Sequence, residues 1–147
     1  MYSSLDVAAY IVSVAGETSC MKLQKMCYYA HGWSLVWRDE PLFNDEIRAW
    51  RSGAVIIPFY EFHKSKATLT PESFKGIALQ ELGGHEKVIV DTMIEAFRYV
   101  PSWDLAMSIT GHDCWKKAYE SESLVMDTDS IKETFEILDR ELVSEGN

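Results

Sequence analysis

The sequence lacks the features of a secreted or membrane protein. It has three cysteines, Cys20, Cys27 and Cys114, an odd number without a CxxC pair, which predicts reduced thiols rather than a disulfide framework. No basic segment opens the chain, which argues against a signal peptide. The longest apolar runs, such as residues 54–57, are too short to span a bilayer. We therefore expect a cytoplasmic protein with no membrane contact.

Basic residues are also scarce. Lys and Arg total 14 against 23 Asp and Glu, which gives a net charge of −9, so the chain should repel the phosphate backbone of nucleic acids. The acids concentrate near the end, where residues 120–145 hold nine acids and two bases. This distribution predicts an acidic end and a more basic front. The basic residues of the front are Lys22, Lys25, Arg38, Arg48, Arg51, Lys64 and Lys66.

The motifs of several enzyme classes are missing. Gly83-Gly84 is not followed by the Gly-Lys-Ser/Thr of a phosphate-binding loop, and there is no Gly-x-Ser-x-Gly or His-Glu-x-x-His. Acidic pairs such as Asp45-Glu46 lie in polar segments, not in the apolar setting that acid–base catalysis usually needs. We therefore expect no catalytic residues, no enzymatic activity and no cofactor.

Four residues leave a metal site open as an alternative. Cys27 and His31 have the i, i+4 spacing of one helix face, and His112 and Cys114 lie together later in the chain, so the four could form a tetrahedral zinc site. Cys27 with a histidine could also form a nucleophile pair, although an apolar setting disfavours a thiolate. Because the spacing matches no common zinc module, we expect buried thiols, hydrogen-bonded histidines and no metal.

Helical periodicity dominates what the chain does contain. Apolar residues make up 47% and aromatic residues 12% of the sequence, enough for a sizeable core. Capping signals, glycines and prolines delimit the apolar stripes. Residues 68–84 read as a long loop that could include a short strand at 77–79. The predicted helices span residues 4–15, 20–38, 57–63, 85–99, 103–110, 115–119 and about 130–142.

The predicted helix over 20–38 is apolar on more than one side, as is typical of a central, buried helix. Gly32 lowers its helix propensity, which predicts the close approach of another element there. We therefore predict an all-α fold, a single domain over 1–147 with six or seven helices around this central one. The acidic last helix should bury the stripe Ile131, Phe135, Leu138 and Leu142.

Aromatic residues near the middle of the chain are candidates for a protein-binding surface. Trp50-Arg51 and Phe59-Tyr60 flank a turn at Gly53, and such residues often anchor interfaces because they bury large areas at little entropic cost. Core burial is the competing interpretation, and we prefer it for Trp50 and Phe59. Arg51 and Tyr60 have polar tips that can reach water, so they are the better probes of binding.

Two blocks of this sequence resemble a known family. Residues 21–33, MKLQKMCYYAHGW, resemble the LKLQKLLYYAQGW signature of the Panacea domain, found in SocA-like antitoxins and also called the phage-associated GepA-like domain. Residues 41–55, with PLF and EIRAWRSGAV, resemble its PLF…I.AWKYGPVV block. Ala54 and Cys114 stand where the family has proline. The resemblance runs from about residue 4 to 142.

The resemblance implies a mainly helical, non-enzymatic module that neutralises a toxin by direct binding, in one member as an adaptor that delivers its toxin to a protease. We therefore expect a protein partner, a cognate toxin above all, with a host protease or defence protein as other partners. The acidic end suggests an alternative, a phage-encoded inhibitor whose acidic surface occupies the basic cleft of a host defence or nucleic-acid-binding protein.

Overall fold

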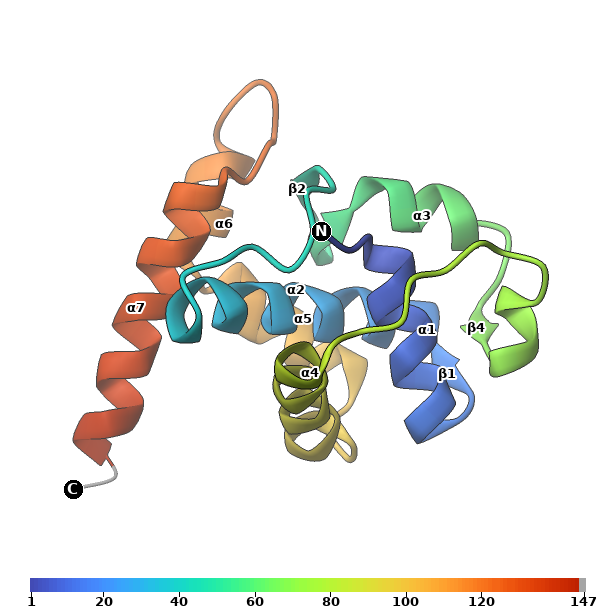
Figure 1. The fold of residues 1–147 in the computed structure, drawn as a ribbon. Coiled ribbons are helices and arrows are strands. Elements are labelled where there is room, and N and C mark those ends of the chain that lie inside the picture. Colours follow the sequence, from blue (N-terminus) through green and yellow to red (C-terminus); the bar gives the residue numbers. More distant parts are fainter. Residues whose placement is uncertain (146–147) are drawn as a thin grey trace.

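The computed structural model describes residues 1–145. Over this range the chain forms seven α-helices and two small antiparallel sheets (Figure 1), which confirms the predicted mainly helical fold. The elements are α1 (Ser4–Ala15), β1 (Thr18–Ser19), α2 (Cys20–Trp37), β2 (Ile47–Trp50), β3 (Gly53–Ile56), α3 (Ile57–His63), β4 (Thr68–Leu69), the 3₁₀ helix η1 (Pro71–Phe74), α4 (Gly84–Phe97), α5 (Ser102–Thr110), α6 (Asp113–Tyr119) and α7 (Thr128–Glu145).

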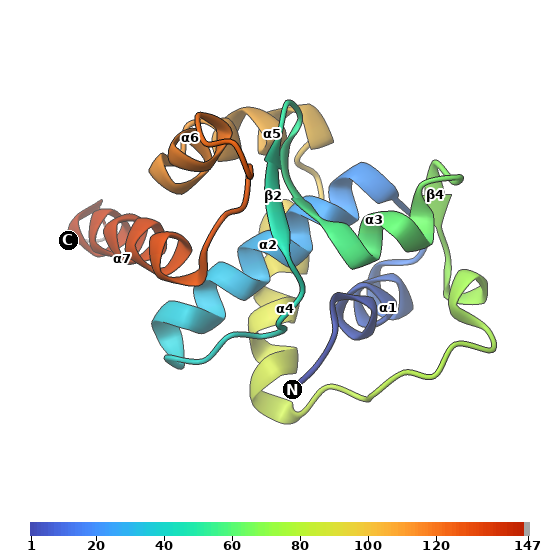
Figure 2. The same ribbon diagram turned by 90° about the horizontal axis from the view of Figure 1, so that it is seen from above.

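Helix α2 runs through the middle of the molecule (Figure 2). The Ser19 side chain caps its first turn by accepting the Lys22 N–H at 3.1 Å. Helices α1, α4, α5 and α7 and strand β3 all contact it, so most of its circumference is buried and Leu23 and Tyr28 have no exposed surface. Burial on every side explains why the sequence of α2 has no single apolar stripe.

Gly32 is the point where α7 meets α2. A Cβ atom built on Gly32 would lie 2.4 Å from ring carbons of Phe135, so only glycine leaves room for this ring. The ring also packs edge-on against Tyr28, Tyr29 and Trp33. The predicted close approach at Gly32 is confirmed, and the element responsible is the last helix.

A β-hairpin lies against the first half of α2, where the sequence indicated only a turn. Strands β2 and β3 pair in antiparallel register from Ile47 opposite Ile56 to Trp50 opposite Gly53, with a two-residue turn between them. The Gln24 side chain fastens the hairpin to α2, because it accepts the Ile56 N–H at 2.7 Å and donates to the Ile56 carbonyl at 3.1 Å. The hairpin therefore has a fixed position over this end of the helix.

Two sequence predictions are wrong. Residues 77–79 form no strand, because their backbone pairs with no neighbouring strand in the described chain. Leu142 is 55% exposed, since the second half of α7 extends beyond the rest of the molecule (Figure 1). Within the predicted stripe of α7, Ile131 and Phe135 are buried and Leu138 is partly buried.

Candidate partner-binding pocket

The four candidate residues separate into three environments. Trp50 at the end of β2 and Tyr60 on α3 are half-buried, with ring centroids 4.9 Å apart in an edge-to-face contact. Arg51 is exposed at the tip of the hairpin. Phe59 has no exposed surface and packs against His63 in the core. The structure therefore brings Trp50 and Tyr60 together, places Arg51 at their edge and removes Phe59 from the surface.

Trp50 and Tyr60 line a pocket of about 290 Å³. Its walls come from the first two turns of α2, the hairpin turn, and the end of α3 with the loop that follows. Trp115 of α6 braces the hairpin from outside, because its indole N–H donates to the Trp50 carbonyl at 3.0 Å. Three lysines and one histidine contribute to the lining, and no Asp or Glu does. The pocket is therefore cationic within a strongly acidic chain.

Lys25 is the most unusual residue of this pocket. Its side chain is only 1% exposed, and burial lowers its pKa from 10.5 to about 8. Gly53 of the hairpin turn lies beside it, since a Cβ built there would be in van der Waals contact with the Lys25 Cε at 3.8 Å, and the Gly53 φ of +118° favours glycine. Among residues 1–145 the Lys25 side chain has no acceptor and no ion-pair partner.

A neutral histidine completes the inner wall of the pocket. The Gln24 amide nitrogen lies 3.0 Å from His63 Nε2. Because the amide oxygen of Gln24 already accepts from Ile56, this nitrogen donates and His63 Nε2 accepts. Burial lowers the pKa of His63, which agrees with a neutral ring. His63 thus adds no charge beside Lys25.

Three of the four residues of the zinc alternative have hydrogen-bond partners, and the fourth, Cys27, is a fully buried thiol. The Tyr28 hydroxyl lies 2.9 Å from His112 Nδ1 and 3.3 Å from Cys114 Sγ, and His31 Nδ1 accepts the Leu42 N–H at 3.3 Å. Burial lowers the pKa of both histidines to about 4 and raises that of the Cys27 thiol. Within residues 1–145, no three His, Cys, Asp or Glu side chains are placed to hold a metal ion.

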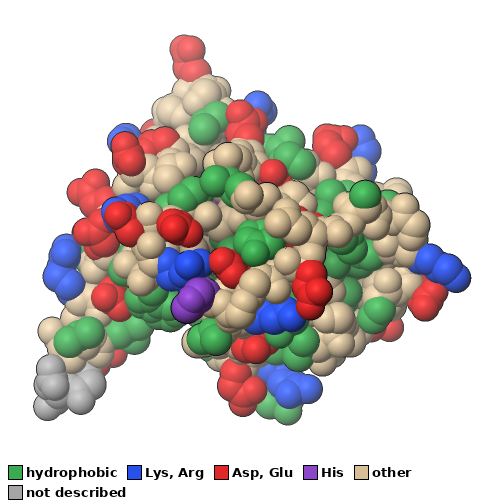
Figure 3. All heavy atoms as spheres, viewed as in Figure 1, with side chains coloured by type: hydrophobic (Ala, Val, Ile, Leu, Met, Phe, Trp, Pro, Cys, Tyr) green, Lys and Arg blue, Asp and Glu red, His purple; other side chains and the backbone are tan. Residues whose placement is uncertain are grey.

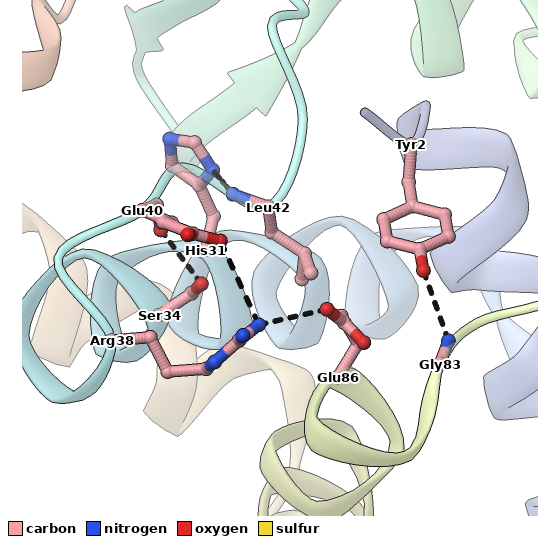
Figure 4. Close-up of polar contacts among 8 residues, drawn as sticks. All are labelled: Tyr2, His31, Ser34, Arg38, Glu40, Leu42, Gly83 and Glu86. Carbon is pink, nitrogen blue, oxygen red and sulfur yellow. Dashed lines mark hydrogen bonds and ion pairs between the residues drawn. The ribbon is translucent and has the colours of Figure 1, made fainter.

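A second polar cluster, at the C-terminal end of α2, is fully paired (Figure 4). Arg38 forms ion pairs with Glu86 at 2.7 Å and with Glu40 at 3.8 Å. The Ser34 hydroxyl donates to the Glu40 carbonyl at 2.7 Å. These contacts join α2, the loop after it and α4, so this cluster is structural and differs from the unpaired lysine of the pocket.

A comparison with protein-family models shows to which family the chain belongs. The model described as "Antitoxin SocA-like, Panacea domain" matches residues 23–116, nearly two thirds of the chain. The chain belongs to the SocA-like Panacea family. The matched range contains α2 from its fourth residue onward, the hairpin and α3, and thus most of the pocket. No curated protein and no solved structure matches the chain at a significant level.

Sequence reasoning missed Lys25 as a site residue of this Panacea domain. It counted Lys25 only among the basic residues of the front, since lysine on a helix normally extends its ammonium to water. The available signal was its position, because Lys25 lies between Leu23 and the apolar residues Met26 and Cys27 on the helix predicted to be central.

None of the helices in the described chain is long and apolar enough to cross a membrane.

Proposed function

We propose that this Panacea domain is the antitoxin of a toxin–antitoxin pair and neutralises its toxin by direct, stoichiometric binding. Membership of a SocA-like antitoxin family carries the proposal. A non-catalytic role fits the buried Cys27 thiol and the buried neutral histidines, none of which is prepared for nucleophilic or acid–base work. Delivery of the bound toxin to a host protease is an extension of the same function.

The surface formed by Trp50, Arg51 and Tyr60 is our candidate for toxin binding. These residues combine an edge-to-face aromatic pair with an exposed guanidinium, which is the residue chemistry that dominates binding energy at protein interfaces. Trp50 and Tyr60 line a pocket into which a partner side chain can insert. Protein interfaces concentrate their affinity at such anchors.

The experiment is co-expression with the product of the adjacent gene as the candidate toxin, followed by calorimetry on the purified pair. Arg51→Ala and Tyr60→Ala should each weaken binding by about 1–3 kcal/mol and leave the fold intact. Trp103→Ala is the matched control, because Trp103 is an aromatic residue of α5 that is 69% exposed and does not line the pocket. If both pocket variants bind like the wild type and Trp103→Ala does not, the interface lies on α5.

One observation favours a second candidate, an inhibitor of a basic host protein. Most of the acids in residues 120–145 are exposed, and α7 extends along one side of the molecule with acidic side chains on its surface (Figure 3). A surface of this sign could occupy a basic, nucleic-acid-binding cleft. The acidic helix and the pocket lie at different ends of α2, so the two candidates make different predictions.

A further inference from the structure

The Lys25 side chain combines charge, burial and the absence of a partner. An ammonium removed from water is unfavourable unless an anion or hydrogen-bond acceptors compensate it, and lysine is rarely fully buried without a partner. Lys25 is 1% exposed and has no such partner within the described chain. Within residues 1–145 the free protein therefore holds a largely buried cation that no protein group compensates.

The ammonium of Lys25 opens into the pocket. Among residues 1–145, no fully enclosed side-chain nitrogen or oxygen atom lacks a hydrogen-bond partner. Since the Lys25 Nζ has none, it must keep a small contact with solvent, and the cavity that Lys25 lines is the pocket beside Trp50 and Tyr60. An anion that enters this pocket would reach the ammonium directly.

The charges around Lys25 also favour an anion. Lys64 and Lys66 lie at the rim of the pocket. Lys64 is paired with Glu61 at 2.7 Å, whereas Lys66 has no ion-pair partner in the described part of the chain. With no acidic residue in the lining, Lys25 and Lys66 give the pocket a net positive charge that attracts a negative group.

The size and donors of the pocket indicate which anion fits. A volume of about 290 Å³ is at the small end for ligand sites and suits one inserted side chain. Phosphate sites usually gather several donors, such as Arg forks or successive backbone N–H groups, whereas this pocket offers a single buried ammonium. One ammonium and two aromatic rings suit a carboxylate on a short aliphatic stem.

We propose that the pocket receives an acidic side chain, Asp or Glu, of the partner protein, whose carboxylate pairs with the Lys25 ammonium while its stem packs against Trp50 and Tyr60. This inference rests on the proposed function, because it identifies the chemistry by which the toxin is anchored. The partner's carboxylate supplies the negative counter-charge that the Lys25 ammonium lacks in the isolated protein.

A measurement without any partner tests the pocket itself. The probe is N-acetyl-glutamate N-methylamide, and the readout is the 13Cε resonance of Lys25 in lysine-labelled protein, assigned by its loss in Lys25→Met. We expect a saturable shift with the glutamate probe and none with the matched glutamine amide. An equal shift with glutamine, or a stronger one with inorganic phosphate, would overturn the assignment to an acidic side chain.

A second measurement uses the toxin. Lys25→Met should weaken toxin binding about tenfold or more, because the partner's carboxylate is then buried without its cation. The matched control is Lys22→Met on the same helix, where Lys22 Nζ donates to the Arg98 carbonyl outside the pocket. We expect it to bind within about twofold of the wild type.

The outcomes separate this inference from the proposed function. If the wild type does not bind the toxin, the proposed function is wrong, and the glutamate probe still tests the pocket. If the wild type and Lys25→Met bind the toxin equally while both are folded, the inference is wrong and the antitoxin function stands. If Lys25→Met binds the toxin more weakly and Lys22→Met does not, the result supports both the inference and the proposed function.

Discussion

At the scale of a single residue, the buried Lys25 should destabilise the protein when no partner is bound. Burial lowers the pKa of Lys25 from 10.5 to about 8, which corresponds to at most about 3 kcal/mol of destabilisation at pH values below 8. Methionine has a similar length and no charge, so Lys25→Met should raise the free energy of unfolding at pH 7 by up to about 3 kcal/mol. Urea denaturation of the two proteins measures this difference.

The pH dependence gives the same prediction a sharper form. Between about pH 8 and 10.5 the unfolded chain binds the Lys25 proton and the folded chain does not, so the wild type gains stability as pH rises through this window. The gap between the wild type and Lys25→Met should therefore narrow over this range. Cys20 also lines the pocket and burial raises its pKa, but it is present in both proteins, so its contribution cancels. A gap that stays constant would show that folding does not lower the pKa of Lys25.

At the scale of an element, the contact between α2 and α7 depends on Gly32. Gly32→Ala improves helix propensity by about 1 kcal/mol, but its Cβ would lie 2.4 Å from the Phe135 ring, which four other rings hold in place. Overpacking should win, with a net loss of about 1–3 kcal/mol. Gly84→Ala at the start of α4 is the control, because nothing lies within 4 Å of its Cβ position.

Thermal melts of the two alanine variants and of Gly32→Ala combined with Phe135→Leu complete this test. The smaller leucine should recover part of the lost stability, since it frees space beside residue 32. If Gly32→Ala melts at or above the wild-type temperature, the two helices pack less closely than the structure indicates.

The elements also show what the sequence alone can predict. Helices α1 and α3 have the predicted bounds because their ends are marked locally, by the Ser3–Asp6 capping box and Gly16 for α1 and by Pro58 for α3. The hairpin was missed because Gly53–Ile56 is buried at every position, so it lacks the alternation that identifies a strand. The burial of Lys25 was missed as a consequence, because it depends on the hairpin that covers this side chain.

At the scale of the whole molecule, α2 separates two surfaces of opposite sign. The cationic pocket lies at the N-terminal half of α2, while α7 packs at Gly32 in the other half, and α3 and α7 lie on opposite sides of α2 (Figure 2). Lys25 and Gly32 are seven residues apart, about 10 Å along the axis of α2, which exceeds the Debye length of about 8 Å at physiological salt. Charge changes on α7 should therefore have little effect at the pocket.

This separation distinguishes the two candidate functions. In the variant Asp129→Lys, Glu133→Lys, Glu141→Lys, three exposed acids of α7 are reversed. An antitoxin that uses the pocket should keep its toxin affinity within about twofold at 0.15 M salt, whereas an inhibitor that inserts α7 into a basic cleft should lose its activity. The companion variant Tyr60→Ala should weaken toxin binding if the protein is an antitoxin that uses the pocket. It should leave the inhibitory activity unchanged if the protein is an inhibitor that uses α7. Calorimetry with the toxin measures the antitoxin activity, and competition against DNA for a basic host protein measures the inhibitory activity. If the charge-reversed variant of α7 no longer binds the toxin, the antitoxin surface lies on α7.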